Sequence, residues 1–162
     1  MSNASFPAGR RQFLASLGLL GVTALAACRS VLPAVEAMAA SRAAAQTVAD
    51  LRAGHGLLPL APDPALEKAA LAQAGYMALA GRMEHTALAG RDFVSRLRAG
   101  GIRGPAAENL AHGRMDIDQL FAIWMGSPPH RRNMLDPRFA RFGLGYAADG
   151  GDGRYWALVL AA

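Results

Sequence analysis

The spacing of apolar residues along the chain predicts four helices followed by two strands. Apolar positions between Val35 and Leu51 recur at roughly helical intervals, which is the pattern of a helix with one buried side. The Ala-rich stretch 30–45 contains few turn formers and is expected to be a tether that passes into this first helix. Gly54 marks its end, because glycine commonly follows the last helical residue.

Sequence signals at both ends define the next two helices. Asp63 precedes Pro64, and an aspartate cap followed by proline in the first turn is typical of a helix start. This second helix ends at Gly81, and its inner stripe consists of Leu66, Ala70, Ala74 and Met77. A third, short helix is predicted for residues 92–99, where a pair of glycines follows and stops it.

The C-terminal third of the chain carries a fourth helix and two strands. Asp116 with Gln119 three residues later predicts a helix that begins with a capping box, and two prolines from Pro128 onward end it. Residues 142–146 alternate bulky side chains with glycine, so one face of this strand admits close packing. Residues 155–161 are apolar on both faces, as expected of a central strand covered on both sides.

The N-terminal residues have the features of an export signal. No acidic residue precedes Arg10 and Arg11, and the apolar run Phe13–Ala27 follows them. This run is shorter than the roughly 20 residues that a helix needs to span a bilayer, and it matches the apolar region of a signal peptide. The sequence Arg10-Arg11-Gln12-Phe13-Leu14 resembles the twin-arginine motif for export of folded proteins. An ordinary Sec signal with two arginines is the alternative.

Cys28 is the only cysteine of the chain, so an internal disulfide is excluded. The sequence Leu25-Ala26-Ala27-Cys28 resembles a lipobox, in which the cysteine is acylated before the signal is cleaved. We therefore expect a lipoprotein that is anchored to a membrane through Cys28; a buried free cysteine in an N-terminal helix is the alternative. Arg29 after the cysteine, instead of aspartate, favours the outer membrane if the host is Gram-negative.

Composition favours one packed domain behind this signal. The chain has 162 residues, of which 52% are hydrophobic and 18% charged, and these figures exclude a disordered chain. The net charge is +5, and without Arg10 and Arg11 the remaining 15 basic residues exceed the 12 acidic ones by three. This scattered excess does not indicate nucleic-acid binding. We expect a signal peptide at 1–27, a lipidated tether at 28–45 and a monomeric domain at 46–162.

Several segments of the expected domain resemble the bacterial branch of the CAP superfamily, which also includes plant pathogenesis-related proteins and insect venom allergens. In chain order they are His85-Thr86, Glu108-Asn109-Leu110-Ala111 with Gly113, residues 124–135, Phe142–Tyr146 and Tyr155-Trp156. The resemblance covers residues 48–161 and implies an α+β fold, a three-layer α-β-α sandwich around a small antiparallel sheet. This fold agrees with the helices and strands predicted above.

The resemblance also implies a cleft lined by two histidines and two glutamates. By position, His85 and His130 match the histidines and Glu108 matches one glutamate, whereas Ser127 occupies the place of the second glutamate. His and Glu both ligate Zn²⁺, so His85 and His130, together with Glu108, are candidate ligands for zinc or another divalent cation. The alternative is structural, with each of the three organising the cleft through hydrogen bonds.

Three classes of function remain open: a non-catalytic module that binds a lipid, peptide or glycan of the cell envelope, a metal-assisted hydrolase of envelope material, and a structural or adhesive surface domain. The sequence has no Gly-x-Ser-x-Gly elbow, no Ser-His-Asp signature and no cysteine left free after lipidation. A covalent nucleophile is therefore not evident, and the unassisted hydroxyl of Ser127 is a poor general base. We favour the binding module, with no firm catalytic residue and no certain cofactor.

We predict that Cys28 carries the lipid anchor. Cells that express the chain or its Cys28→Ala variant are labelled with a fatty-acid analogue and fractionated. The wild-type chain should take up the label and remain with the membranes, because two or more acyl chains hold a protein firmly at a bilayer. The variant should lose both properties. Equal labelling and equal membrane recovery of the two chains would contradict the prediction.

Overall fold

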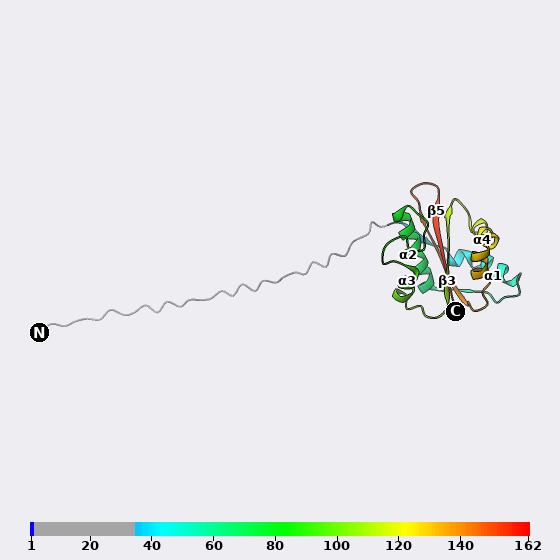
Figure 1. Cartoon of the computed structure of the whole chain (residues 1–162), viewed down its shortest axis with the longest axis horizontal. Coiled ribbons are helices and arrows are strands. Elements are labelled where there is room, and N and C mark those ends of the chain that lie inside the picture. The colour runs from blue at the N-terminus through cyan, green and yellow to red at the C-terminus, as the bar shows by residue number, and fades with distance from the viewer. Residues whose placement is uncertain (2–34) are drawn as a thin grey trace. The chain divides into compact units, whose positions relative to one another are not determined.

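The computed structural model describes residue 1 and residues 35–162, so the predicted signal peptide and Cys28 lie outside the described residues. Residues 35–162 belong to one compact unit, in which helices cover both faces of a sheet (Figure 1). In chain order its elements are β1 (Ala37–Ala39), α1 (Ser41–Ala53), β2 (Ala61–Pro62), α2 (Pro64–Ala80), α3 (Phe93–Ala99), β3 (Ala106–Gly113), α4 (Ile117–Gly126), α5 (Pro128–Met134), β4 (Arg141–Ala148) and β5 (Arg154–Ala161). None of the helices in this part of the chain is both long and apolar enough to cross a membrane.

Strand β5 has a partner along its full length on each side. The strand order is β1-β4-β5-β3, all antiparallel, and the short β2 adds a parallel pair to β4. Val159 of β5 lies opposite Glu108 of β3 on one side and opposite Gly143 of β4 on the other. Strand β3 therefore lies at one edge of the described sheet, and this edge carries Glu108.

Each face of the sheet has its own hydrophobic core, and β5 contributes to both. The even-numbered residues Trp156–Leu160 pack with side chains of α1, α4 and α5. The odd-numbered residues Tyr155–Ala161 pack with side chains of α2 and with residues around α3. This division follows from the alternation of side chains along a strand. It confirms the predicted central strand covered on both faces, and with it the three-layer α-β-α sandwich.

The helix ends predicted from capping signals are confirmed. The side chain of Asp63 accepts hydrogen bonds from two backbone N–H groups at the start of α2, at 2.8 and 3.0 Å. Gly81 follows α2 with a left-handed φ of 64°, a conformation that costs glycine no steric strain. Asp92 caps α3, and Asp116 and Gln119 form the reciprocal capping box of α4.

Residues that precede the predicted domain start at 46 already belong to the fold. Residues 37–39 form β1, which pairs with β4 through Met38 and Tyr146, and α1 begins at Ser41. The domain therefore starts at or before Ala37. Three residues in an Ala-rich segment are too few to show a strand periodicity, so only pairing with β4 identifies them as a strand.

Two further elements do not follow from the sequence pattern. Strand β3 contains the buried polar residues Glu108 and Asn109, which interrupt the apolar alternation on which strand prediction depends. Helix α5 begins at Pro128, where two prolines were expected only to end the preceding helix. Proline in the first turn is equally compatible with a helix start, because the N–H it lacks has no partner there.

The glycines of β4 set how closely α2 approaches the sheet. A Cβ atom added at Gly143 would lie 2.0 Å from the backbone nitrogen of Glu67 in α2. A Cβ added at Gly145 would lie 2.8 Å from Cδ2 of Leu71. The prediction that one face of this strand admits close packing is thus confirmed, and the backbone of α2 lies against that face.

We predict that Gly143→Ala destabilises the domain by about 3 kcal/mol or more, because the added methyl group meets backbone atoms that cannot move aside. Gly75→Ala in α2 is the matched control, since a Cβ there meets nothing within 4 Å and alanine favours a helix by about 0.5–1 kcal/mol. Urea unfolding of both variants measures the difference. Similar midpoints for Gly143→Ala and wild type would show that α2 can shift.

Candidate functional site

Glu108 projects from β3 into the protein and has both carboxylate oxygens engaged. Its side chain is 2% exposed. Oε1 lies 2.8 Å from Nδ1 of His85, and Oε2 accepts a hydrogen bond from Nη2 of Arg96. The Arg96 side chain is itself 3% exposed, so the two opposite charges form a buried ion pair.

Arg96 also fixes the loop that carries His85. From α3, its Nη1 donates to the backbone oxygen of Arg91 at 2.6 Å and to that of His85 at 3.3 Å. Gln73 of α2 donates to the backbone oxygen of Glu84 in the same loop. The segment between α2 and α3 is therefore held by two helices although it forms neither helix nor strand.

The His85 ring presents its Nε2 edge outward. The side chain is 61% exposed, and its Nδ1 contacts a carboxylate. Because an ionised carboxylate only accepts hydrogen bonds, the proton lies on Nδ1. When the ring is neutral, Nε2 therefore keeps a lone pair that can accept a hydrogen bond or ligate a cation.

His130 lies on α5 and is tied to β3 through its backbone. Nδ2 of Asn109 donates to the backbone oxygen of His130 at 3.2 Å, and Oδ1 of Asn109 accepts from Nδ2 of Asn133 at 2.8 Å. Glu108 and Asn109 are neighbours on one strand, so their side chains leave it on opposite faces. Two successive residues of β3 thus hold the His85 loop on one face and α5 on the other.

The His130 ring is half-buried and prefers to be neutral. Its Nδ1 is buried and has no hydrogen-bond partner among the described residues. Burial lowers the pKa of His130, and the positive charge of His85 lowers it further. That His85, Glu108 and His130 share one cleft stays a prediction.

Ser127 lies at the junction of α4 and α5. It is the capping residue of α5, and its side chain makes no capping hydrogen bond. The backbone is extended there, with φ −100° and ψ 116°. The structure thus places Ser127 about one helical turn before His130. Within residues 35–162, the hydrogen bonds of His85 and Glu108 do not involve its hydroxyl.

The described residues do not fit a three-ligand metal site. Residues 35–162 contain no group of three or more His, Cys, Asp or Glu side chains arranged to hold an ion. A catalytic zinc site needs three protein ligands, and here Glu108 is occupied by a cation, Arg96. The two imidazoles are the groups that could contact a metal, and metal binding stays a prediction.

Arg96, which contacts both Glu108 and the His85 loop, was not among the residues predicted from the sequence. The hydrogen bond between Asn133 and Asn109 was not predicted either. An arginine one residue before the apolar Leu97 on a short helix carries no sign of burial in the sequence. The only available signal is physical: Glu108 lies in a strand that pairs with the central β5, and a carboxylate buried there requires a cationic partner.

Comparison with known proteins defines the family. Residues 45–160 match the CAP family, described as the cysteine-rich secretory protein family. The chain belongs to this family. Its CAP domain is similar to the uncharacterized protein YkwD of Bacillus subtilis (strain 168), with 32% identity over 100 residues, or 61% of this chain and 39% of that protein. The chain therefore spans about two fifths of the length of this relative.

Two solved structures share the fold of the CAP domain. An outer surface protein from Borrelia burgdorferi has a TM-score of 0.67 and 19% identity, with 78% of this chain and 97% of that chain covered. An extracellular protein containing an SCP domain from Bacillus anthracis str. Ames has a TM-score of 0.60 and 24% identity, with 74% and 40% covered. At these identities the structures establish the fold of the domain.

We predict that His130 titrates below the usual histidine pKa of about 6.5. Replacing His85 with Gln should raise the pKa of His130 but leave it below the usual value, because burial is the larger cause. Two-dimensional NMR of the imidazole protons in the presence of a chelator measures both values. A pKa of His130 at or above 6.5 in the wild type would contradict the burial of its ring.

The lowered pKa of His130 makes the free energy of unfolding depend on pH. At a pH between the His130 pKa of the folded state and that of the unfolded state, the unfolded chain binds more protons at His130 than the folded chain. The contribution of His130 to the free energy of unfolding therefore rises with pH. As the pH falls below about 6.5, that contribution should be lost. If the free energy of unfolding showed no such loss at low pH, the His130 ring would have to be solvated in the folded state.

Proposed function

We propose that the protein is an exported lipoprotein whose CAP domain binds a ligand of the cell envelope without catalysing a reaction. The observation that carries the proposal is the engagement of Glu108. Both of its oxygens are held, by Arg96 and by His85. Glu108 is therefore already shared between Arg96 and His85 as a hydrogen-bond acceptor, and Ser127 supplies no second carboxylate.

A hydrolytic role is the second candidate, and one contact favours it. His85 is oriented by Glu108 through Nδ1, which is how a carboxylate orients a catalytic imidazole in hydrolases. Such a pair acts on a nucleophile within hydrogen-bond reach of the other ring nitrogen. Among residues 35–162, the side-chain hydrogen bond of His85 goes to Glu108 and not to a Ser or Thr hydroxyl, so this arrangement supports binding better than catalysis.

Export and anchoring complete the proposal. Relatives of the same fold are described as an outer surface protein and an extracellular protein, which supports a location outside the cytoplasm. The segment 1–27 would be removed as a signal, and Cys28 would hold the domain at the membrane by its acyl chains. The outer membrane is the favoured destination in a Gram-negative host. The ligand would be a lipid, a peptide or a glycan of the envelope, bound by a monomeric domain.

The test compares metal binding and turnover in the soluble domain, residues 30–162. The domain is incubated with zinc, magnesium or calcium and with peptides, peptidoglycan and lipid esters. We expect no turnover above background, because a missing general base typically costs about 10²- to 10⁴-fold in rate. Ser127→Glu, which restores a carboxylate, should raise the affinity for zinc measured by calorimetry.

Two controls make this test decisive. His130→Ala removes one imidazole of the cleft and should weaken the zinc binding of the Ser127→Glu variant. Robust turnover by the wild-type domain that disappears in His130→Ala would establish the hydrolase instead. Native protein purified from membranes and analysed by mass spectrometry reports acylation, bound metal and bound lipid on the same sample.

A further inference from the structure

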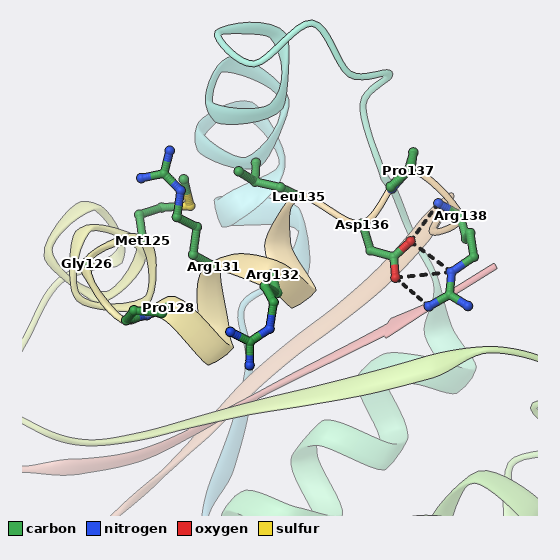
Figure 2. A pocket seen from close by; sticks show the side chains of 9 residues that line it. All are labelled: Met125, Gly126, Pro128, Arg131, Arg132, Leu135, Asp136, Pro137 and Arg138. Atoms are coloured by element: carbon green, nitrogen blue, oxygen red, sulfur yellow. Dashed lines mark hydrogen bonds and ion pairs between the residues drawn. The ribbon is translucent and has the colours of Figure 1, made fainter.

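A groove separate from the candidate site lies beside α5, and its lining residues come from positions 125–138 of the chain. It is lined by Met125, Gly126, Pro128, Arg131, Arg132, Leu135, Asp136, Pro137 and Arg138, with a volume of about 760 Å³. Figure 2 shows α4 and α5 on one side of this groove and the segment 135–138 on the other. His85, Glu108, Ser127 and His130 do not line it. We call it the arginine groove.

The arginine groove carries an excess of positive charge. Asp136 is its one acidic lining residue, and Arg138 already binds it through Nη2 and Nε at 2.7 and 3.0 Å. Arg131 and Arg132 have no carboxylate partner among the described residues. Among the described residues, the Arg131 guanidinium contacts Nε2 of His55 at 3.3 Å, an imidazole that does not neutralise it. Two guanidinium groups are therefore left for an anion.

Between these charges the groove is apolar. Met125, Pro128, Leu135 and Pro137 contribute hydrocarbon surface to its lining. The groove is open rather than enclosed, so a polymer can lie across it without entering a cavity. An acyl tail would remain largely in water there, whereas the apolar face of a sugar ring needs cover on one side only.

The wall of the arginine groove is fixed before a ligand arrives. Arg52 of α1, which is 1% exposed, donates to the backbone oxygens of Met134 at 2.8 Å, Asp136 at 3.2 Å and Phe139 at 3.4 Å. One buried guanidinium thus holds the backbone of residues 134–139 in place. A preformed site loses less entropy on binding than a mobile one.

We propose that the arginine groove binds an acidic polysaccharide of the envelope, with carboxylates on Arg131 and Arg132 and sugar rings on the apolar lining. Guanidinium matches a carboxylate with two parallel hydrogen bonds, as the Arg138–Asp136 pair does within the groove itself, with Nε on Oδ1 and Nη2 on Oδ2. This inference rests on the proposed function, because it gives a ligand class to the binding module. It places that ligand outside the histidine cleft.

The experiment uses the full chain, purified from membranes in a neutral detergent, and polygalacturonate as the probe. The Arg131→Gln/Arg132→Gln double variant is compared with an Arg103→Gln/Arg114→Gln control, which removes the same charge from positions outside the groove. Binding measured by calorimetry should weaken about tenfold or more in the groove variant, because each charge-assisted hydrogen bond is among the strong ones. The control variant should bind like the wild type. Added NaCl should weaken the binding of the wild type and of the control variant.

Several outcomes separate the alternatives. Equal binding by the groove variant and the control variant, with unchanged circular dichroism, would overturn the proposal, as would equal binding of neutral dextran. Binding to micelles doped with phosphatidylglycerol that depends on Arg131 and Arg132, without binding to polygalacturonate, would assign the groove to lipid headgroups and overturn it too. Shortening of the polygalacturonate would contradict the non-catalytic function while leaving the groove as the place where the polymer binds.

Discussion

The candidate site depends on one constraint, the burial of the Glu108 carboxylate on β3, the edge strand that pairs with β5. Taking a carboxylate out of water is costly unless a counter-charge and hydrogen bonds compensate. Arg96 provides the charge and, with His85, the hydrogen bonds. The same guanidinium binds the backbone at Arg91 and His85. One residue therefore both neutralises Glu108 and positions the His85 loop.

This pairing also limits the chemistry of the CAP cleft. A cleft with two free carboxylates could hold a cation and accept protons, as the resemblance to the wider family implies. Here one carboxylate is locked against arginine, and the place of the other is taken by Ser127. Of the candidate residues, His85 has a largely exposed imidazole and Ser127 a hydroxyl that makes no capping hydrogen bond, and both groups are suited to hydrogen bonding with a bound molecule. The neutral form of His130, favoured by its burial, fits this role.

The parts of the fold that could be predicted are those encoded by local signals. Caps at Asp63, Asp92 and Asp116 define the starts of α2, α3 and α4. The alternation of bulky side chains with glycine in residues 142–146 defines β4 and the face against which α2 packs. The parts that could not be predicted depend on distant partners. Strand β1 exists because it pairs with β4, and the polar residues of β3 are tolerated because Arg96 and Asn133 bind them. The candidate residues came from motifs, but which of them touch could be read only from the folded chain.

Arg52 connects the first helix of the domain to residues that lie 82 to 87 positions later in the chain. Contacts across such long separations close large loops, and they form late because the loop entropy must be overcome first. The wall of the arginine groove is therefore completed only when the beginning and the end of the domain have docked. Local opening of α1 would loosen this wall while the hairpin of β4 and β5 keeps its own hydrogen bonds. Proteolytic susceptibility of residues 134–139 would then report the docking of a helix that is remote from them in sequence.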